Sequence, residues 1–371
     1  MKIAFIFGTR PEIIKLSSVI RLSVREKIPF VTIHTGQHYS TVMSRRFFRE
    51  LDLPMPDYNL NIRSKAPWRQ GDHTGRMMMR LEQILLKELP GVVVVHGDTN
   101  STLAGALTAS KISTTKAFTG FDIKLAHVEA GLRSYDRSMP EEINRIMADH
   151  LSDLLFVPTV KSRDIVLSEG VKRKKVFVTG NTFVDTLYFK RPEWSGNLPG
   201  SPDKGGYILL TIHRQENVDD KKRFVGILKA IKKIGVDHKL PIIFPAHPRT
   251  VKKMEEFGIS VSGWMELMEP CAFTEFIALE ANAALILTDS GGVQEEACVL
   301  LVPCVTLRDS TERPETVDVG ANIIAGIDPV NIVKSARVML SRKRDWKNPF
   351  GDGRAAERIL DVLVRQFGRK K

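Results

Sequence analysis

Short runs rich in Val, Ile, Leu and Phe alternate with longer amphipathic segments along this chain. Such short apolar runs are typical of parallel strands that helices bury on both faces, so the alternation predicts a doubly wound α/β protein. In the first half of the chain it predicts strands at residues 2–7, 30–34, 91–96, 124–128, 154–157 and 176–179. In the second half it predicts strands at residues 207–212, 241–244, 284–288, 303–307 and 322–324.

The segment RPEWSGNLPGSPDKGG, residues 191–206, lies between the two series of predicted strands. Its density of Pro, Gly and Ser is typical of a linker or loop. Because 371 residues exceed what one compact core usually holds, we expect two domains. We place them at residues 1–184 and 185–353, each a Rossmann-like domain with a parallel sheet. A final helix is predicted within residues 354–371.

The net charge and the cysteine content limit the partners and the cellular compartment that we expect for this protein. A net charge of +12 favours a polyanionic partner, which could be nucleic acid, a membrane surface or a phosphorylated substrate. No aromatic residues interleave with the basic clusters, so a solvated surface is favoured over a nucleic-acid site. No apolar run approaches the roughly eighteen residues that span a membrane, and no signal peptide is apparent. The three cysteines form no CxxC pair, so we expect a cytoplasmic protein without disulfides.

Polar side chains gather directly after the predicted strands. The segments concerned are Gly8–Glu12, His96–Thr99, His127–Arg133, His213–Arg214, His247–Arg249 and Asp289–Gly292. In open parallel sheets, ligands bind beyond the carboxyl ends of the strands. The sequence therefore predicts a site built from these segments, in a cleft between the two domains.

The segment TDSGGVQEEA places Ser290, Gly291 and Gly292 between a predicted strand and a helix. Free N–H groups at a helix start favour an anion, although two glycines also suit a plain tight turn. Glu295 and Glu296 follow in the first helical turns, where acidic residues also complement the helix dipole. A phosphate on the turn and ribose hydroxyls on a carboxylate would use both features. The segment therefore predicts nucleotide binding.

Neither a G-x-G-x-x-G fingerprint nor a Walker motif follows any predicted strand, which argues against a redox dinucleotide and against P-loop chemistry. Cations that could neutralise a diphosphate remain at Arg10, Lys15, Arg214 and Arg313. Glu141 and Arg145 lie four residues apart on a predicted helix. They form either a routine helix pair or a carboxylate with an orienting partner.

Two His-x-acid pairs, His96 with Asp98 and His127 with Glu129, end neighbouring predicted strands. Residues two apart on a strand share a face, so the members of each pair can point together. One interpretation is a metal-assisted hydrolase. The other is metal-free acid/base chemistry by Asp98 and Glu129, with pKa values adjusted in a shielded cleft.

A series of motifs resembles the UDP-N-acetylglucosamine 2-epimerase family. In the family's order, they are FGTRPEIIK, TGQH, VHGDT, HVEAGLRS, PEEINR, TGNT, TDSGGVQEEA, TERPE and NPFGDG, and they cover nearly the whole chain. The short loop between GLRS and MPEEINR resembles the archaeal-type, non-hydrolysing members. The resemblance implies the glycosyltransferase-B architecture, with the active site in the interdomain cleft and residues 354–371 packed back on the first domain.

The resemblance also implies an activity. It is the reversible conversion of UDP-N-acetylglucosamine to UDP-N-acetylmannosamine, by elimination of UDP across carbons 1 and 2 and its re-addition to a bound unsaturated sugar. No metal and no other cofactor is implied, nor any nucleic-acid partner or membrane insertion, and the implied assembly is a homodimer. The alternative is the hydrolysing form of the enzyme, which releases UDP and free N-acetylmannosamine.

The resemblance assigns the site residue by residue. Catalytic roles fall to Asp98, Glu129, Glu141 and His213. Substrate contacts are assigned to Arg10, Lys15, Phe276, Ser290, Gly291, Gly292, Glu296 and Arg313. From their positions in the sequence described above, we add Arg145 and Arg214 to the predicted substrate contacts. Among these, the Ser-Gly-Gly turn would bind phosphate, Glu296 the ribose, and Phe276 would lie beside the uracil.

Two positions depart from the bacterial pattern. Cys271 stands where bacterial members carry Gln, which changes the expected contact with uracil. Tyr39 and Ser40 stand where those members carry Arg and an acid or amide that help to bind a second UDP-N-acetylglucosamine as activator. Allosteric activation of this chain is therefore a hypothesis only.

Overall fold

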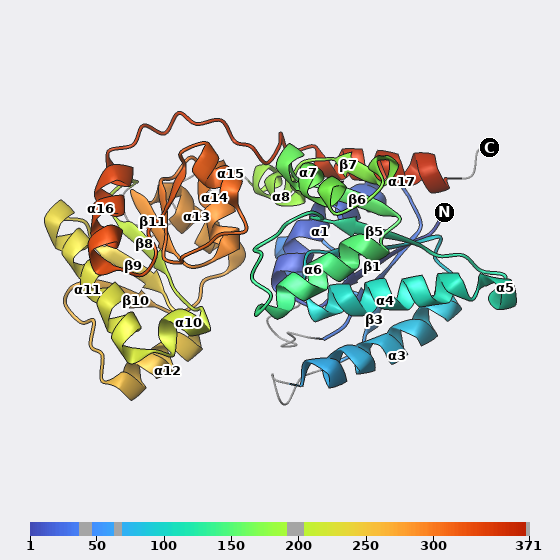
Figure 1. The fold of residues 1–371 in the computed structure, drawn as a ribbon, viewed down its shortest axis with the longest axis horizontal. Helices are drawn as coiled ribbons and strands as arrows, with labels where there is room; N and C mark the ends of the chain where they lie inside the picture. The colour runs from blue at the N-terminus through green and yellow to red at the C-terminus, as the bar shows by residue number, and fades with distance from the viewer. Residues whose placement is uncertain (37–46, 63–68, 191–203, 369–371) are drawn as a thin grey trace. The chain divides into compact units, whose positions relative to one another are not determined.

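The computed structural model describes residues 1–36, 47–62, 69–190 and 204–368 (Figure 1). The chain divides into two compact units. Unit 1 comprises Met1–Phe189 with Phe350–Lys371, and unit 2 comprises Lys190–Pro349. Most of the predicted linker at residues 191–206 lies outside the described residues, as do Tyr39 and Ser40.

Unit 1 contains, within its described residues, a seven-stranded sheet in the order β3-β2-β1-β4-β5-β6-β7, with every pair parallel. Its strands are β1 Ile3–Phe7, β2 Phe30–His34, β3 Tyr58–Asn59, β4 Val92–His96, β5 Lys124–Val128, β6 Leu154–Val157 and β7 Val176–Val178. Each predicted strand of this half is confirmed. The additional strand, β3, is a two-residue edge strand and is too short to form an apolar run.

The helices of unit 1 pack in two groups. Their bounds are α1 Arg10–Arg25, α3 Gln70–Glu88, α4 Asn100–Thr114, α5 Lys116–Thr119, α6 Pro140–Leu151, α7 Val160–Ser168, α8 Thr182–Phe189 and α17 Ala355–Phe367, with a 3-10 turn at Arg173–Lys175. Helices α3, α4 and α6 pack together, and α1, α8 and α17 pack together. The C-terminal helix α17 buries Ile359, Leu360 and Leu363 there.

Unit 2 contains, in its described part, a six-stranded parallel sheet in the order β10-β9-β8-β11-β12-β13. Its strands are β8 Ile208–Thr211, β9 Ile242–Pro245, β10 Met265–Met268, β11 Leu285–Thr288, β12 Cys304–Thr306 and β13 Asn322–Ile324. Its helices are α10 Gln215–Val218, α11 Lys221–His238, α12 Pro248–Phe257, α13 Phe273–Asn282, α14 Gly291–Val299, α15 Pro314–Asp318 and α16 Pro329–Leu340. The strand missed by the sequence analysis is again an edge strand, β10.

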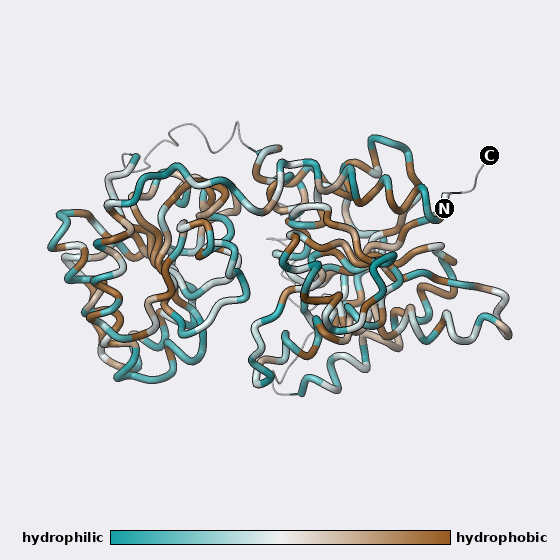
Figure 2. The backbone as a smooth tube through the Cα atoms, turned by 45° about the horizontal axis from the view of Figure 1, so that its top comes forward, coloured by the Kyte–Doolittle hydropathy of each residue, from teal (hydrophilic) through white to brown (hydrophobic). Residues whose placement is uncertain are grey.

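Both faces of the second sheet are buried by helices. Alternate residues of β8 point to opposite faces: Ile208 and Leu210 join a core with α11 and α16, while Leu209 joins a core with α13 and α14. Figure 2 shows the strands of each unit as apolar, brown segments. The predicted fold class, two doubly wound Rossmann-like domains, is confirmed. Across the described residues, no helix is long and apolar enough to cross a membrane.

Candidate active site

The strand order of each sheet reverses at one point. In unit 1 the reversal falls between β1 and β4, and in unit 2 between β8 and β11. Loops after such strands diverge and leave room for a ligand at the carboxyl edge of the sheet. The chemistry-bearing residues predicted from the sequence lie mainly on these loops and the helices that follow them.

Glu129 is the centre of the polar cluster in unit 1. It follows β5 in a left-handed backbone conformation, with φ of 66°, and its side chain is buried. The ammonium group of Lys15 donates to Glu129 Oε1, and His96 Nε2 lies 3.4 Å from Glu129 Oε2. A Cβ placed on Gly97 would lie 3.4 Å from the same Oε2. The Glu129 carboxylate thus lies between the side chains of Lys15 and His96 and the backbone turn at Gly97.

Asp98 lies on the loop after β4 and is paired with Arg145 of α6. The Asp98 side chain keeps 33% of its surface exposed, so one side of the carboxylate faces solvent. Arg145 is held from behind, because its Nη1 lies 2.8 Å from Glu142 Oε2. Glu142 in turn accepts hydrogen bonds from the backbone N–H groups of Ser134 and Tyr135. A buried acid that the sequence analysis assigned no role therefore sets the position of a predicted substrate contact.

Glu12 organises the loop that carries Arg10. It is buried and accepts hydrogen bonds from the backbone N–H groups of Gly8 and Thr9 and from the Thr99 hydroxyl. Burial raises the pKa of Glu12, although these hydrogen bonds oppose the shift. Because Thr99 follows β4, this one side chain ties the loops after β1 and β4 together. The exposed Arg10 side chain projects from the loop so formed.

The two His-x-acid pairs do not point together as the strand alternation predicted. His96 instead lies beside Glu129, while Asp98 and His127 contact residues of α6. The reason is local: β4 ends at His96 and β5 at Val128, and the next residue in each loop has a positive φ. A left-handed residue ends the two-residue periodicity that the prediction assumed.

Glu141 lies in the first turn of α6 with its side chain exposed. The residues that the structure describes offer it no hydrogen bond or ion pair, whereas its neighbour Glu142 is fully engaged. The structure therefore brings together Lys15, Asp98, Glu129 and Arg145 within unit 1. It leaves Arg10 and Glu141 at the surface of the same unit.

A pocket of about 280 Å³ opens beside α14 in unit 2. It is lined by Thr211, Ile212, His213, Pro245, His247, Pro270, Cys271, Phe276, Ser290 and Val293. Of the predicted site residues, His213, Phe276 and Ser290 are here. The departure noted at Cys271 lies in the same wall, beside Phe276. His247 follows β9 at the sheet edge, and that position was the only sequence signal for it.

Asp289 holds the loop that carries His213. It is fully buried and accepts hydrogen bonds from the backbone N–H groups of His213 and Arg214 and from the Asn217 amide. Its Oδ1 also lies 3.3 Å from His213 Nδ1. Loss of hydration lowers the pKa of the His213 imidazole, and Asp289 opposes that shift. His213 is therefore a half-exposed ring, oriented by a carboxylate, with its other nitrogen available to a ligand.

The Ser-Gly-Gly turn begins α14, with the Ser290 hydroxyl capping the helix. A Cβ on Gly291 would lie 2.4 Å from Glu312 Oε1, so a side chain there would displace the Glu312 carboxylate. Glu312 lies among Arg308, Arg214 and Arg313. Burial opposes its ionisation, yet these three cations lower the pKa of Glu312 to about 2. The guanidinium groups that could neutralise a diphosphate are thus held by a permanently charged carboxylate.

The two carboxylates of α14 have different partners. Glu295 is buried and accepts a hydrogen bond from Arg313 Nε at 3.1 Å. Glu296 is partly exposed, and its Oε1 lies 3.6 Å from the position of a Cβ on Gly292. Burial raises the pKa of Glu280, and the adjacent Glu296 raises it further. Glu296 is therefore the carboxylate of α14 that is accessible from the turn.

No group of three or more His, Cys, Asp or Glu side chains within the described ranges is arranged to hold a metal ion.

Known proteins similar to this chain agree on one family. A family model described as UDP-N-acetylglucosamine 2-epimerase matches residues 21–364. The UDP-N-acetylglucosamine 2-epimerase of Methanocaldococcus jannaschii is 50% identical over 98% of this chain and 99% of its own length. Its crystal structure in complex with UDP-GlcNAc and UDP matches with a TM-score of 0.89, over 98% of this chain and 100% of that one. The UDP-2,3-diacetamido-2,3-dideoxy-D-glucuronate 2-epimerase of Pseudomonas aeruginosa is 41% identical, over 98% and 100% of the two chains.

Proposed function

The chain belongs to the UDP-N-acetylglucosamine 2-epimerase family, and on this premise we propose that it interconverts UDP-N-acetylglucosamine and UDP-N-acetylmannosamine. Carbon 2 of the sugar is not adjacent to a carbonyl group, so direct removal of its proton is very costly. Elimination of UDP across carbons 1 and 2 gives a bound unsaturated sugar instead. Re-addition of UDP, with the proton delivered to the opposite face of carbon 2, completes the inversion.

The observation that carries the proposal is the pair of carboxylates at the carboxyl edge of the first sheet. Glu129 is fixed between Lys15 and His96, and Asp98 is held by Arg145 with one side exposed. Positioned carboxylates of this kind can remove and return a proton during elimination and addition. We assign the proton transfers at carbon 2 to Asp98 and Glu129, with Glu141 as a further candidate on the neighbouring helix.

Unit 2 supplies groups suited to the nucleotide. The start of α14 offers the backbone N–H groups of Gly291 and Gly292 to a phosphate, and Arg214 and Arg313 can balance the charge that develops on departing UDP. Glu296 suits the ribose hydroxyls, Phe276 the face of the uracil, and His213 the diphosphate or sugar. Arg10 of unit 1 is assigned to the substrate as well.

Proton NMR of the purified protein with UDP-N-acetylglucosamine in heavy water tests the proposal. We expect UDP-N-acetylmannosamine with deuterium at carbon 2, at a rate that a chelator leaves unchanged. Asp98→Asn and Glu129→Gln should each lower the rate by about 10²- to 10⁴-fold, the usual contribution of a positioned acid or base. Accumulation of UDP and free N-acetylmannosamine would instead identify a hydrolysing enzyme.

A parallel reaction with a UDP-2,3-diacetamido-glucuronate substrate resolves the substrate class, because a relative of that specificity is 41% identical. We expect the N-acetylglucosamine derivative to be turned over faster. A preference for the diacetamido-glucuronate would retain the chemistry and overturn the assigned substrate.

We further infer a cytoplasmic homodimer that needs no metal or other cofactor. The absence of a CxxC pair among three cysteines suits a reducing compartment, and the family resemblance supports the dimer. Sedimentation equilibrium would contradict the dimer if the mass stayed at 41.7 kDa across the working concentration range.

A further inference from the structure

A buried imidazole lies behind the carboxylates of unit 1. His127, in β5, is fully buried, and both of its ring nitrogens face oxygen atoms. Nε2 lies 2.7 Å from the backbone carbonyl oxygen of Gly97, and Nδ1 lies 2.7 Å from Asp149 Oδ1. A carbonyl oxygen only accepts hydrogen bonds, so Nε2 carries a hydrogen.

Asp149 is ionised in this arrangement. It lies in α6, is fully buried, and faces three donors: the His127 ring, Arg133 Nη1 at 2.7 Å and the Gly131 backbone N–H at 3.1 Å. Burial opposes the charge, but His127 and Arg133 outweigh it and lower the pKa of Asp149. A carboxylate accepts hydrogen bonds, so the short contact between Nδ1 and Oδ1 joins the His127 ring to Asp149 as a buried hydrogen-bonded pair.

The hydrogen bonds of this His127–Asp149 pair end on the two loops that carry the proposed acid/base groups. Gly97 immediately precedes Asp98, and Gly131 lies two residues after Glu129. Gly97, Glu129 and Gly131 have φ of 69°, 66° and 81°, and a left-handed conformation at Glu129 is costly for a residue with a side chain. Such a conformation persists only where surrounding contacts hold it, and the His127–Asp149 pair provides a contact on each loop.

We propose that Asp149 is a positioning residue: with the His127 ring, it fixes the loops of Asp98 and Glu129 in their reactive arrangement. This inference rests on the proposed function of those two carboxylates. None of the contacts of Asp149 described here is to either carboxylate, so its effect on the reaction passes through the backbone at Gly97 and Gly131.

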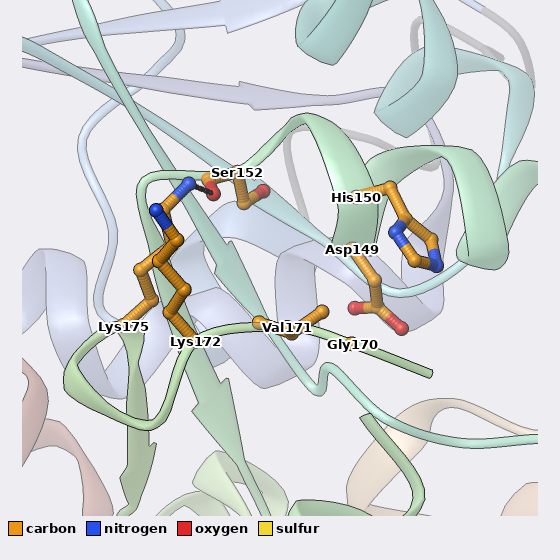
Figure 3. Close-up of a pocket in the computed structure, with 7 residues that line it drawn as sticks. All are labelled: Asp149, His150, Ser152, Gly170, Val171, Lys172 and Lys175. Carbon is orange, nitrogen blue, oxygen red and sulfur yellow. Dashed lines mark hydrogen bonds between the residues drawn. The ribbon is translucent and has the colours of Figure 1, made fainter. Parts of the chain in front are cut away.

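The other side of Asp149 borders a pocket of about 220 Å³ in unit 1. Figure 3 shows its carboxylate beside Gly170, with Lys172 and Lys175 on the opposite wall. Lys175 donates to the Ser152 carbonyl oxygen at 2.9 Å, which fixes that wall. A small anion admitted by this pocket could occupy the place of a missing Asp149 carboxylate, which makes chemical rescue a direct test.

The test compares Asp149→Ala and Asp149→Asn with the control Glu169→Gln. Glu169 accepts hydrogen bonds from Arg133 Nε and Nη2, the latter at 2.6 Å. Its replacement therefore disturbs Arg133 but leaves the hydrogen bonds to Gly97 and Gly131 in place. We expect both Asp149 variants to lose about 10²-fold in kcat with little change in KM, as small misplacements of reacting groups do. Formate should restore much of the kcat of Asp149→Ala, and Glu169→Gln should resemble the wild type.

Two measurements that do not depend on turnover distinguish a failure of this inference from a failure of the proposed function. In the wild type, ¹⁵N NMR of the nine histidines should show a hydrogen on His127 Nε2, as its contact with the Gly97 carbonyl oxygen requires. Hydrogen exchange at Gly131 should accelerate in Asp149→Asn and not in Glu169→Gln. A His127 without a hydrogen on Nε2, or Asp149 variants as active as Glu169→Gln, would overturn the positioning role. A wild type that epimerises no UDP-sugar, with these two signals intact, would overturn only the proposed function.

Discussion

The Lys15–Glu129 contact joins two side chains that sequence reasoning placed on different motifs, and it carries the first prediction. The Lys15 side chain is 10% exposed, and its ammonium group lies closer to the carboxylate of Glu129 than the His96 ring does. Replacing it with Met removes the charge that favours the ionised form of that carboxylate. We expect kcat/KM to fall by about 10²-fold, with the acid limb of the pH–rate profile displaced to higher pH.

The matched control for this variant is Lys111→Met, which removes an exposed lysine near the end of α4. It changes the net charge by the same amount and leaves the contacts of Glu129 intact. An acid limb that moves equally in both variants would show that general charge, rather than the contact, is responsible. An unchanged profile in Lys15→Met would remove Lys15 from the acid/base machinery.

The roles of individual residues could be predicted where a sequence motif fixes the backbone. They could not be predicted where the rotation of a helix decides which of two neighbouring side chains is buried. The Thr9-x-x-Glu12 spacing is a capping-box signature, so the anchoring role of Glu12 could have been found in the sequence. Glu141 and Glu142 are adjacent, and only the packing of α6 shows that Glu142 is the buried one. The resemblance assigned a role to Glu141, and that role stays a prediction.

At the scale of elements, the loop after β5 depends on a glycine that packing makes irreplaceable. Gly131 has φ of 81°, and a Cβ there would lie 2.4 Å from the Ser162 carbonyl oxygen, which belongs to the backbone and cannot move aside. Gly131→Ala therefore adds a clash to the roughly 1 kcal/mol cost of a left-handed residue. We expect a loss of more than about 3 kcal/mol in the free energy of unfolding, measured by urea denaturation.

Gly170→Ala separates the clash from the backbone conformation. Gly170 has φ of 88°, but no atom lies within 4 Å of the Cβ position. This variant should lose only the backbone term of about 1 kcal/mol. Equal losses in the two variants would mean that the loop after β5 yields to the methyl group, and that it is less rigid than its contacts indicate.

The strands buried on both faces were predicted within a residue or two, because their composition follows from burial between helices. The edge strands β3 and β10 were not predicted, because β3 has only two residues and β10 is interrupted by Glu266; the more apolar edge strands β7 and β13 were predicted. The same limit applies just beyond a strand end. There the alternation placed His127 beside Glu129, whereas the left-handed backbone at Glu129 separates their contacts.

At the scale of the whole molecule, the first six strands of each unit have the same spatial order. In each unit the loops that carry the reactive residues lie mainly where that order reverses. The repetition explains why sequence reasoning located the loops correctly without knowing any side-chain contact. The chain nevertheless does not divide simply in two, because its last helix, α17, belongs to unit 1. The contact that holds the start of α17 therefore joins two segments of unit 1 that lie far apart in the sequence.

That contact is made by Asp185 of α8, which accepts hydrogen bonds from the backbone N–H groups of Ala355 and Ala356 at 3.0 and 2.7 Å. Burial raises the pKa of Asp185 to about 6, although the two hydrogen bonds oppose the shift. The ordinary value in an unfolded chain is about 3.9. The folded state therefore binds the proton more tightly, and the resulting stabilisation is complete below about pH 4 and is lost as the pH rises through about 6.

Because the folded state binds the Asp185 proton more tightly, the attachment of α17 should weaken by up to about 3 kcal/mol as the pH rises from about 4 to about 6. Asp185→Asn keeps an accepting oxygen and cannot ionise, so its attachment should vary much less over this range. Hydrogen exchange of the Ala355–Phe367 peptide, corrected for intrinsic rates, measures the difference. Asp361→Asn, which alters an exposed acid of the same helix, should retain the wild-type slope. A wild-type slope in Asp185→Asn would show that another titratable group controls the attachment of α17.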